Sequence, residues 1–398
     1  MRFHTINNWY IMMIDLRNAY KWLGGISVKK LGFGFMRLPL VDESNQKSID
    51  HDIVNDMVDY FIENGFTYFD TAYPYHFGVS EFAIKKCVVD RYPRESFLLA
   101  DKMPVWLVKS TEDYKKIFDE QLTRCGVEYF DYYLLHTLGE KYYADCQKHG
   151  GFDFMKELKA GGLAKNIGFS FHDKAHVLDK ILTKHPEMEF VQLQINYMDW
   201  EDESIESRKC YEVAQKHNKP VIVMEPVKGG SIAQVPDEAL KLFEGYNKDM
   251  SAASWAIRYT ASLSDVIVVL SGMSTYEQLA DNVRYMRNFI PLNEEEHRII
   301  EEVKVIIEES MAIPCTVCQY CIENCPKNIP IPQYFSLYNN QWQFSLTPAH
   351  MNYYMNLTHN FGKASSCIEC RQCEEHCPQH IEIVKWLKEV ARTFEKGK

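Results

Sequence analysis

The feature that most constrains this chain is a cysteine spacing that occurs twice near its C-terminal end. Each copy reads C-x2-C-x2-C-x3-C-P, so that the fourth cysteine is followed directly by proline. Short turns of this kind bring consecutive sulfurs within reach of one shared bound group. The copies are Cys315, Cys318, Cys321 and Cys325, followed by Pro326, and Cys367, Cys370, Cys373 and Cys377, followed by Pro378.

The repeated spacing is typical of two-cluster iron–sulfur proteins, in which three thiolates of one copy hold one 4Fe-4S cluster. The fourth cysteine of that copy ligates the other cluster. The proline after it fixes φ and keeps the chain from continuing as a helix towards the cluster. The sequence therefore predicts two 4Fe-4S clusters, one on Cys315, Cys318, Cys321 and Cys377, the other on Cys367, Cys370, Cys373 and Cys325.

Two other uses of these cysteines compete with the cluster interpretation. Disulfides are disfavoured, because a chain of 398 residues without a secretory leader needs no covalent stapling. Structural zinc sites usually take two cysteine pairs separated by a longer loop, which this spacing does not match. The remaining cysteines are scattered singly and are predicted to be free thiols: Cys87, Cys125, Cys146 and Cys210.

Length and charge limit the class of protein. A length of 398 residues suits one large domain of about 250 to 300 residues and a small one. The formal net charge of −11, with no basic run, argues against nucleic acid or an anionic membrane as a partner. The N-terminal stretch 1–20 is mildly apolar, but Asp15 and Arg17 keep it far short of the ~20 apolar residues of a membrane span. It also lacks a signal-peptide cleavage pattern, so a cytoplasmic location is expected.

Short apolar runs alternate with amphipathic stretches along residues 1–290. In 50–64, for example, apolar residues recur at intervals of three and four, as in a helix with one buried face. Eight strand–helix units at a spacing of roughly thirty residues predict an α/β fold, a (β/α)8 TIM barrel. No GxGxxG follows an early strand, which disfavours a doubly wound sheet. The candidate strands are 31–38, 66–72, 96–103, 130–136, 164–170, 189–195, 220–226 and 265–272.

A linker helix is predicted within 291–310. It begins at 293 with a capping box and acidic residues that suit the positive end of the helix dipole, and its apolar stripe is expected to pack on the barrel. The remaining segment, 311–398, is the predicted iron–sulfur domain. It contains helix-like stretches at 331–343 and 380–394, so a small, mostly helical domain is expected around the clusters.

Chemistry in such a barrel lies at the carboxyl ends of the strands. Four titratable residues fall there: Asp70, Tyr75, Lys102 and His136. Carbonyl reduction by hydride needs a proton donor, and a tyrosine hydroxyl serves if its pKa is brought nearer to working pH. A neighbouring lysine ammonium would favour the phenolate, and an aspartate would hold that lysine in place. His136 could then orient the substrate oxygen by a hydrogen bond.

These residues lie in motifs that resemble the aldo/keto reductases. The matching runs are FDTAYPYHFGVSE at 69–81, the lysine of ADKMP, the histidine of YYLLHTL and IGFSFHD at 167–173. With the C-terminal cysteines, the chain resembles the branch of that family that carries a ferredoxin-type domain. The resemblance implies a catalytic tetrad with Tyr75 as proton donor. It also implies that Ser170 and Gln192 hold the nicotinamide carboxamide of NAD(H) or NADP(H).

The chain departs from the family pattern at three positions near the cofactor. Phe171 stands where many members have asparagine, and Met224 where many stack a tyrosine on the nicotinamide. Gln278 stands where NADP-preferring members usually place arginine, whose guanidinium suits a 2′-phosphate, so NAD is the expected coenzyme. The remaining predicted cofactor contacts are Gly34, Met36, Arg37, Glu225, Lys228, Ser274, Asp281 and Asn282.

The expected function is an NAD(P)(H)-dependent oxidoreductase that interconverts a small-molecule carbonyl and an alcohol. Its clusters would be structural or would pass electrons to a redox protein partner. The alternative is an iron–sulfur electron-transfer module whose barrel is a docking platform or a flavin or nicotinamide site. A third interpretation is a barrel that binds the nucleotide as a redox sensor. A tuned Tyr–Lys–Asp set favours the first, because a platform has no use for one.

Overall fold

The computed structural model describes residues 29–42, 45–203, 205–344 and 348–395. The apolar stretch at 1–20 lies outside the described residues. Internal contacts divide the chain into two compact units. The first contains the chain through Asp202, Glu206–Pro226 and Ser254–Leu292; the second contains Glu203–Ile205, Val227–Ala253 and the chain from Asn293 onwards.

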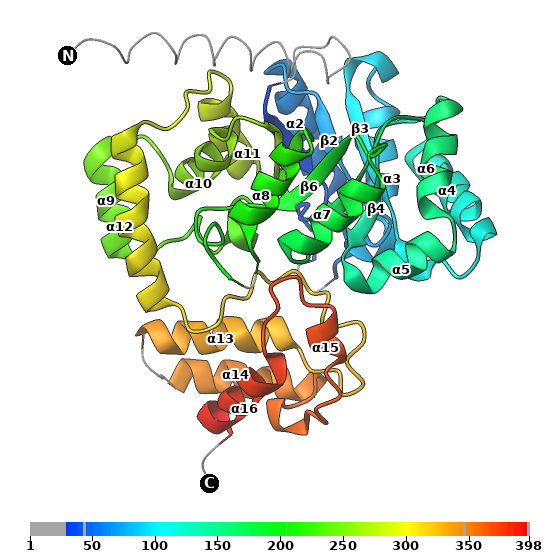
Figure 1. Ribbon diagram of the computed structural model, residues 1–398. Coiled ribbons are helices and arrows are strands. Elements are labelled where there is room, and N and C mark those ends of the chain that lie inside the picture. Colours follow the sequence, from blue (N-terminus) through cyan, green and yellow to red (C-terminus); the bar gives the residue numbers. More distant parts are fainter. Residues whose placement is uncertain (1–28, 43–44, 204, 345–347, 396–398) are drawn as a thin grey trace. The chain divides into compact units, whose positions relative to one another are not determined.

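Eight parallel strands form a closed barrel in the first unit (Figure 1). Each strand pairs with the next, and β8 closes the barrel on β1. The predicted (β/α)8 barrel is confirmed, although several strands are shorter than predicted. The strands are β1 (Leu31–Gly34), β2 (Tyr68–Asp70), β3 (Leu98–Met103), β4 (Phe130–Leu138), β5 (Ala164–Phe171), β6 (Phe190–Gln194), β7 (Val221–Met224) and β8 (Val266–Gly272).

Amphipathic helices alternate with the strands. Helix α2 (His51–Glu63) shows the sequence logic: the Asp50 side chain accepts hydrogen bonds from the backbone N–H groups of Asp52 and Ile53. Its apolar residues, including Met57 and Phe61, are buried. The other helices of this unit are α3 (Ser80–Ile84), α4 (Thr111–Cys125), α5 (Glu140–Lys148), α6 (Gly151–Ala160), α7 (Ala175–Lys184), α8 (Ser207–Lys216), most of α10 (Ala252–Ala261) and α11 (Tyr276–Met286).

The barrel interior is filled by side chains. Tyr68, Tyr132 and Phe190 form a continuous aromatic row, with ring centroids 5.2 Å apart at both contacts. Gly32 leaves room for this row, because a β carbon there would lie 2.8 Å from the side chains of Leu270 and Val268. A packed interior leaves the strand ends and their loops as the place for a site.

The second unit contains two long helices outside the cysteine region. Helix α12 (Glu294–Ser310) begins at the predicted capping box, in which the Asn293 side chain accepts from the Glu296 N–H and Glu296 accepts from the Asn293 N–H. It packs against α9 (Asp237–Asn247). The predicted linker at 291–310 is therefore a helix with its own partner in this unit.

The cysteine region consists of two similar halves that lie 52 residues apart in the sequence. Left-handed backbone occurs at matched positions, at Val317 and Gln319 in the first half and at Glu369 and Arg371 in the second. A further matched pair, Asn328 and His380, lies three residues after the fourth cysteines. The backbone turns therefore recur at matched positions in the two halves.

Helices complete each half and form the core of this region. Helices α13 (Ile331–Phe344) and α16 (Ile383–Phe394) begin at matched positions and pack together, and α14 (Pro348–Asn360) packs on α13. The Asn339 side chain donates to the Ile313 carbonyl at 2.7 Å and accepts from the Ile313 N–H at 2.8 Å. This holds the chain just before Cys315. The short helix α15 (Gln372–Glu375) lies within the second cysteine motif. The region is mostly helical, as predicted.

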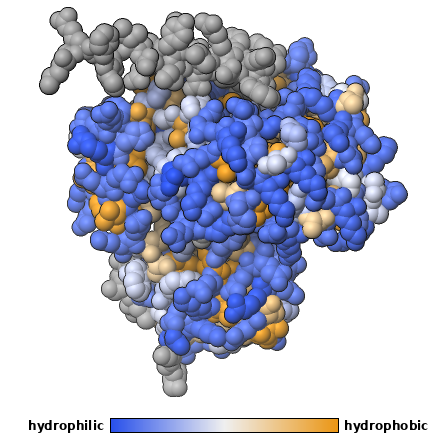
Figure 2. Space-filling model, in the orientation of Figure 1, coloured by the Kyte–Doolittle hydropathy of each residue, from blue (hydrophilic) through white to orange (hydrophobic). Residues whose placement is uncertain are grey.

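The face shown in Figure 2 is largely hydrophilic, with hydrophobic residues in smaller areas between. This fits the charged fraction of 25% and the net charge of −11. Over the part of the chain that the structure describes, no helix combines the length and the apolar character needed to cross a membrane.

Candidate active site and cluster sites

A buried ion pair lies at the ends of β2 and β3. The Lys102 Nζ donates to Asp70 Oδ1 at 2.5 Å and to the Thr71 carbonyl at 2.7 Å. Both charged side chains are almost completely buried. Because β2 and β3 pair in register, with Asp70 opposite Ala100, the two strand ends bring these side chains together. Two predicted site residues therefore meet directly.

Tyr75 lies in the turn that follows β2. The Lys102 Nζ is 5.0 Å from the centre of the Tyr75 ring, and the side chain stays partly open to solvent. The next two residues, His76 and Phe77, are both left-handed, with φ of 51°. His76 holds this strained turn, because its Nε2 accepts from the Leu38 N–H at 3.1 Å and its Nδ1 lies 2.8 Å from the Gln46 carbonyl.

His136 lies near the end of β4 and completes the predicted set. Its ring meets the Tyr75 ring edge to face, with centroids 6.1 Å apart. Its Nδ1 is buried without a hydrogen-bond partner among the described residues. Trp106, in the turn after β3, packs 5.2 Å from the His136 ring and 6.4 Å from the Tyr142 ring. Trp106 and Tyr142 were not predicted, although Trp106 follows Lys102 by four residues.

The protonation states follow from burial. Loss of solvent raises the pKa of Tyr75 well above its usual value, and the nearby carboxylates of Asp70 and Glu225 raise it further. Burial and these carboxylates therefore favour the protonated phenol over the phenolate. Burial also lowers the pKa of His136 far below its usual value, reinforced by Lys102. Both directions favour the neutral forms, a phenol on Tyr75 and an imidazole on His136.

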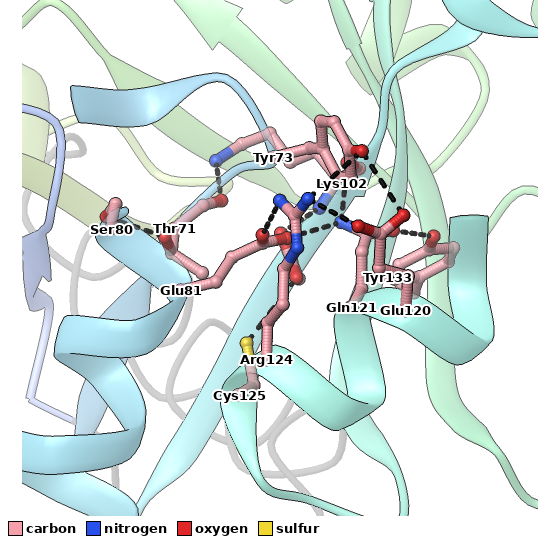
Figure 3. A network of polar contacts seen from close by, with 11 residues as sticks. Thr71, Tyr73, Ser80, Glu81, Lys102, Glu120, Gln121, Arg124, Cys125 and Tyr133 are labelled. Carbon is pink, nitrogen blue, oxygen red and sulfur yellow. Dashed lines mark hydrogen bonds and ion pairs between the residues drawn. The ribbon is translucent and has the colours of Figure 1, made fainter. Parts of the chain in front are cut away.

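A polar network supports Lys102 from the helix side of β3 (Figure 3). Gln121 donates to the Lys102 carbonyl and to Glu81, both at 3.1 Å, and Arg124 donates to Glu81 at 2.9 Å. The Asp101 carboxyl accepts from the Lys102 N–H at 2.8 Å. Burial and the adjacent Glu81 raise the pKa of Asp101 well above its usual value, which favours the protonated form of Asp101.

The predicted carboxamide contacts lie close to this set. Ser170 Oγ accepts from the Thr137 N–H at 2.7 Å, which leaves its own hydrogen free to donate. Gln192 is buried next to Asp70, and its hydrogen bond opposes the rise in the pKa of Asp70 that burial causes. The Gln192 Oε1 has no partner among the described residues. An amide group with one N–H and one carbonyl would satisfy both side chains.

Most other predicted cofactor residues lie near the ends of β1 and β8. Ser274 Oγ donates to the Arg37 carbonyl at 2.9 Å, and the Ser274 N–H donates to Gln278 Oε1 at 2.8 Å. Gly34 belongs to β1, whose end lies beside Gly272 of β8, and Met36 follows it. Arg37 also lies 3.9 Å from Glu225, which has left-handed backbone at the end of β7.

Three further predicted contacts also have partners within the protein. Asn282 is buried and bonds Ser271 at 2.9 Å and Tyr285 at 2.5 Å, which makes it part of the packing under the loop. Asp281 pairs with Arg284 at 2.7 Å. Lys228 belongs to the second unit, where its Nζ donates to Gln379 at 3.4 Å. Its role as a nucleotide contact stays a prediction.

The eight motif cysteines gather in two groups of four. Burial raises the pKa of Cys321, and the neighbouring thiols of Cys318, Cys315 and Cys377 raise it further, with a smaller effect from Cys373. We call these four, Cys315, Cys318, Cys321 and Cys377, site 1. In the other group, burial, together with Glu374, Cys367 and Cys325, raises the pKa of Cys373 to about 12. Site 2 comprises Cys325, Cys367, Cys370 and Cys373.

The arrangement fits two clusters. One cavity is lined by all four thiols of site 2 and by Ile329, Ile331 and Leu387. The exchange of the fourth cysteine between the halves is the ligand grouping predicted from the spacing. No three acidic, histidine or cysteine side chains of the described residues converge on a single-ion position. All twelve cysteines are free of disulfides, and the four outside the motifs are buried.

The buried ion pair gives a direct prediction. Lys102→Met should lower the free energy of unfolding by about 3–5 kcal/mol, because Asp70 stays buried without its cation. The double change with Asp70→Asn should recover most of that loss. Urea unfolding followed by circular dichroism measures both. Lys115→Met removes an exposed pair with Asp119 and should cost less than about 1 kcal/mol. Equal losses for Lys102→Met and the double variant would contradict the coupling.

Comparison with known proteins agrees with the sequence and the geometry. The profile of the aldo/keto reductase family matches residues 30–305, and that of the 4Fe-4S dicluster domain matches residues 314–382. The 9,11-endoperoxide prostaglandin H2 reductase of Trypanosoma cruzi (strain CL Brener) is 26% identical over 256 residues, which are 61% of this chain and 79% of that protein.

Solved structures share the fold. The holo form of aldo-keto reductase AKR11C1 from Bacillus halodurans has a TM-score of 0.57 and 24% identity, over 70% of this chain and 93% of that one. An aldo-keto reductase from Klebsiella pneumoniae in complex with NADPH has a TM-score of 0.55 and 18% identity, over 70% and 91%. The chain is thus an oxidoreductase of the aldo/keto reductase family that also carries a 4Fe-4S dicluster domain.

Proposed function

We propose that this protein interconverts a carbonyl and an alcohol, with a nicotinamide dinucleotide as the redox coenzyme. The observation that carries the proposal is the convergence of the buried Lys102–Asp70 pair with Tyr75 and His136 at adjoining strand ends. When bound, the nicotinamide supplies or accepts a hydride. Ser170 would donate to its carboxamide oxygen, and Gln192 Oε1 would accept from its N–H group.

The protein's own residues then handle the proton. In reduction, Tyr75 gives its hydroxyl proton to the substrate oxygen as that oxygen gains negative charge. The Lys102 ammonium stabilises the phenolate left behind, and Asp70 keeps the ammonium in place. His136 is neutral and so can donate one N–H to the substrate oxygen. Trp106 packs beside His136, and Tyr142 packs beside Trp106, so this aromatic surface favours substrates with an apolar part.

Replacement of Tyr75 by Phe tests the proton donor. Carbonyl reduction should fall at least 100-fold, the scale of general acid catalysis, while nicotinamide affinity stays within about twofold. Steady-state rates and fluorescence titration of the nucleotide measure the two quantities. In the unaltered protein, the raised pKa of Tyr75 should keep reduction flat from pH 7 to about 10, whereas alcohol oxidation, which needs phenolate, should rise with pH.

Tyr142→Phe is the matched control. It also removes a tyrosine hydroxyl, but Tyr142 has no proposed role in proton transfer. Its reduction rate should stay within about threefold of the original. Full activity of Tyr75→Phe would refute the tetrad assignment. The trypanosomal relative's name adds an endoperoxide to the panel of aldehydes and ketones worth screening.

We infer NAD as the preferred coenzyme. The loop that begins α11 offers Gln278, whose side chain already accepts from the Ser274 N–H. Arg284, the arginine of this helix, is paired with Asp281. A 2′-phosphate would therefore meet an amide instead of a cation. The Klebsiella structure that contains NADPH shares the fold and leaves this preference to experiment.

Gln278→Arg should raise kcat/KM for NADPH relative to NADH by about tenfold, the effect of one charge-assisted hydrogen bond of ~1.5 kcal/mol. Gln278→Met is the control, because it removes the amide without adding charge and should leave the ratio nearly unchanged. A ratio that already favours NADPH in the unaltered protein would contradict the inferred preference.

We propose that the eight motif cysteines hold two 4Fe-4S clusters that exchange electrons with a redox partner. Cys370 of site 2 is exposed, so this site reaches the surface of its unit. A hydride carries two electrons and each cluster accepts one, so exchange with nicotinamide needs an intermediary such as a flavin. The alternative function, an electron-transfer module on a barrel platform, would need that intermediary and would not need Tyr75.

Anaerobically purified protein should contain close to eight irons per chain and show a broad brown absorption. Iron and zinc analysis checks the content; zinc without iron would refute the clusters. NADH added without a carbonyl should leave the absorption unchanged if the barrel works alone. Bleaching by NADH that persists in Tyr75→Phe would favour the electron-transfer alternative.

A further inference from the structure

The loop after β7 packs into the cysteine region of the second unit. Three successive residues, Lys228, Gly229 and Gly230, have left-handed backbone with φ of 48°, 66° and 102°. A β carbon on Gly229 would lie 2.1 Å from the Thr316 carbonyl oxygen, so the two backbones are in direct contact. Thr316 is buried and lies between the site 1 ligands Cys315 and Cys318. The loop therefore covers the first turn of site 1.

Lys228 reaches the other end of the same site. Its side chain is buried, with 5% of its surface exposed, and its Nζ donates to the Gln379 side chain at 3.4 Å. Gln379 is also buried and follows Cys377, the fourth ligand of site 1, by two residues. The backbone at Gly229 and the side chain of Lys228 thus contact two separate segments that carry site 1 thiols.

The internal repeat shows what Lys228 adds. The residue that matches Gln379 in the first half is Lys327, two residues after Cys325 of site 2. Site 2 therefore has a lysine at the position where site 1 has a neutral glutamine, and Lys327 is among the residues that line the site 2 cavity. At site 1 the lysine comes from outside the repeat and is bound to that glutamine.

We propose that Lys228 is the residue that sets the reduction potential of the cluster in site 1, as the counterpart of Lys327 at site 2. One-electron reduction adds a negative charge to a cluster, and a nearby ammonium stabilises the reduced form. The effect is larger at Lys228 than at Lys327, because Lys327 is exposed and water and ions screen its charge. The inference rests on the proposed two-cluster content.

The test measures the two midpoint potentials of the anaerobic, full-length protein, by titration with dithionite and mediator dyes under electron paramagnetic resonance. Lys228→Met should lower the potential of one cluster. Lys327→Met should lower the potential of the other cluster, by a smaller amount. Lys228→Arg keeps the charge and should retain the original potential. Iron content and circular dichroism are recorded for each variant.

The outcomes separate this inference from the proposed function. A Lys228→Met variant with full iron content and both potentials unchanged would overturn the inference but leave the two-cluster proposal intact. Unchanged potentials together with weakened NADH and NADPH binding would also overturn it, and would make Lys228 a nucleotide contact. Protein without iron would overturn both proposals. If Lys228→Met loses its clusters, a shifted potential in Lys228→Arg would equally refute the charge argument.

Discussion

The buried contact between Lys102 and Asp70 is the interaction on which the proposed chemistry depends. Placing two charges out of reach of water is costly, and in general such pairs add little net stability. Their value lies in position. Because Asp70 ends β2 and Lys102 lies near the end of β3, the closed barrel fixes both backbones before the side chains meet. The ammonium is held beneath Tyr75, where a phenolate would form.

Lys102 can pair with Asp70 alone because the neighbouring acid, Asp101, favours its neutral form. Successive side chains on a strand point to opposite faces, so Asp101 points away from the barrel interior, towards Glu81 and the Cys125 thiol. If Asp101 were charged, its carboxylate and that of Asp70 would both attract the Lys102 ammonium. Burial and Glu81 favour the protonated form of Asp101, and Arg124 forms an ion pair with Glu81 at 2.9 Å. Figure 3 shows Gln121 and Arg124 meeting Glu81 close to Lys102.

The sequence predicts those parts of the structure that depend on local periodicity or on fixed spacing. Strand ends follow from apolar runs, which is why Asp70, Lys102 and His136 could be placed, and the cysteine interval predicts the exchange of Cys325 and Cys377 between the halves. Contacts made by irregular loops follow no sequence periodicity, so they could not be predicted in this way. Trp106 packs on His136 through such a turn, and Lys228, four residues after the end of β7, belongs to the second unit.

The two cysteine motifs have the same spacing, but the residues around them differ, so sites 1 and 2 differ in exposure. Site 1 is covered by the loop that carries Gly229, whose close approach to Thr316 leaves no room for a side chain. Site 2 has Cys370 exposed, with the exposed apolar side chain of Ile368 beside it. A protein that exchanges electrons with this region would meet site 2 first, since electron transfer weakens steeply with distance. Site 1 is then the more distant of the two sites from such a partner. Its lysine, Lys228, is buried, so solvent screens its charge less than that of Lys327.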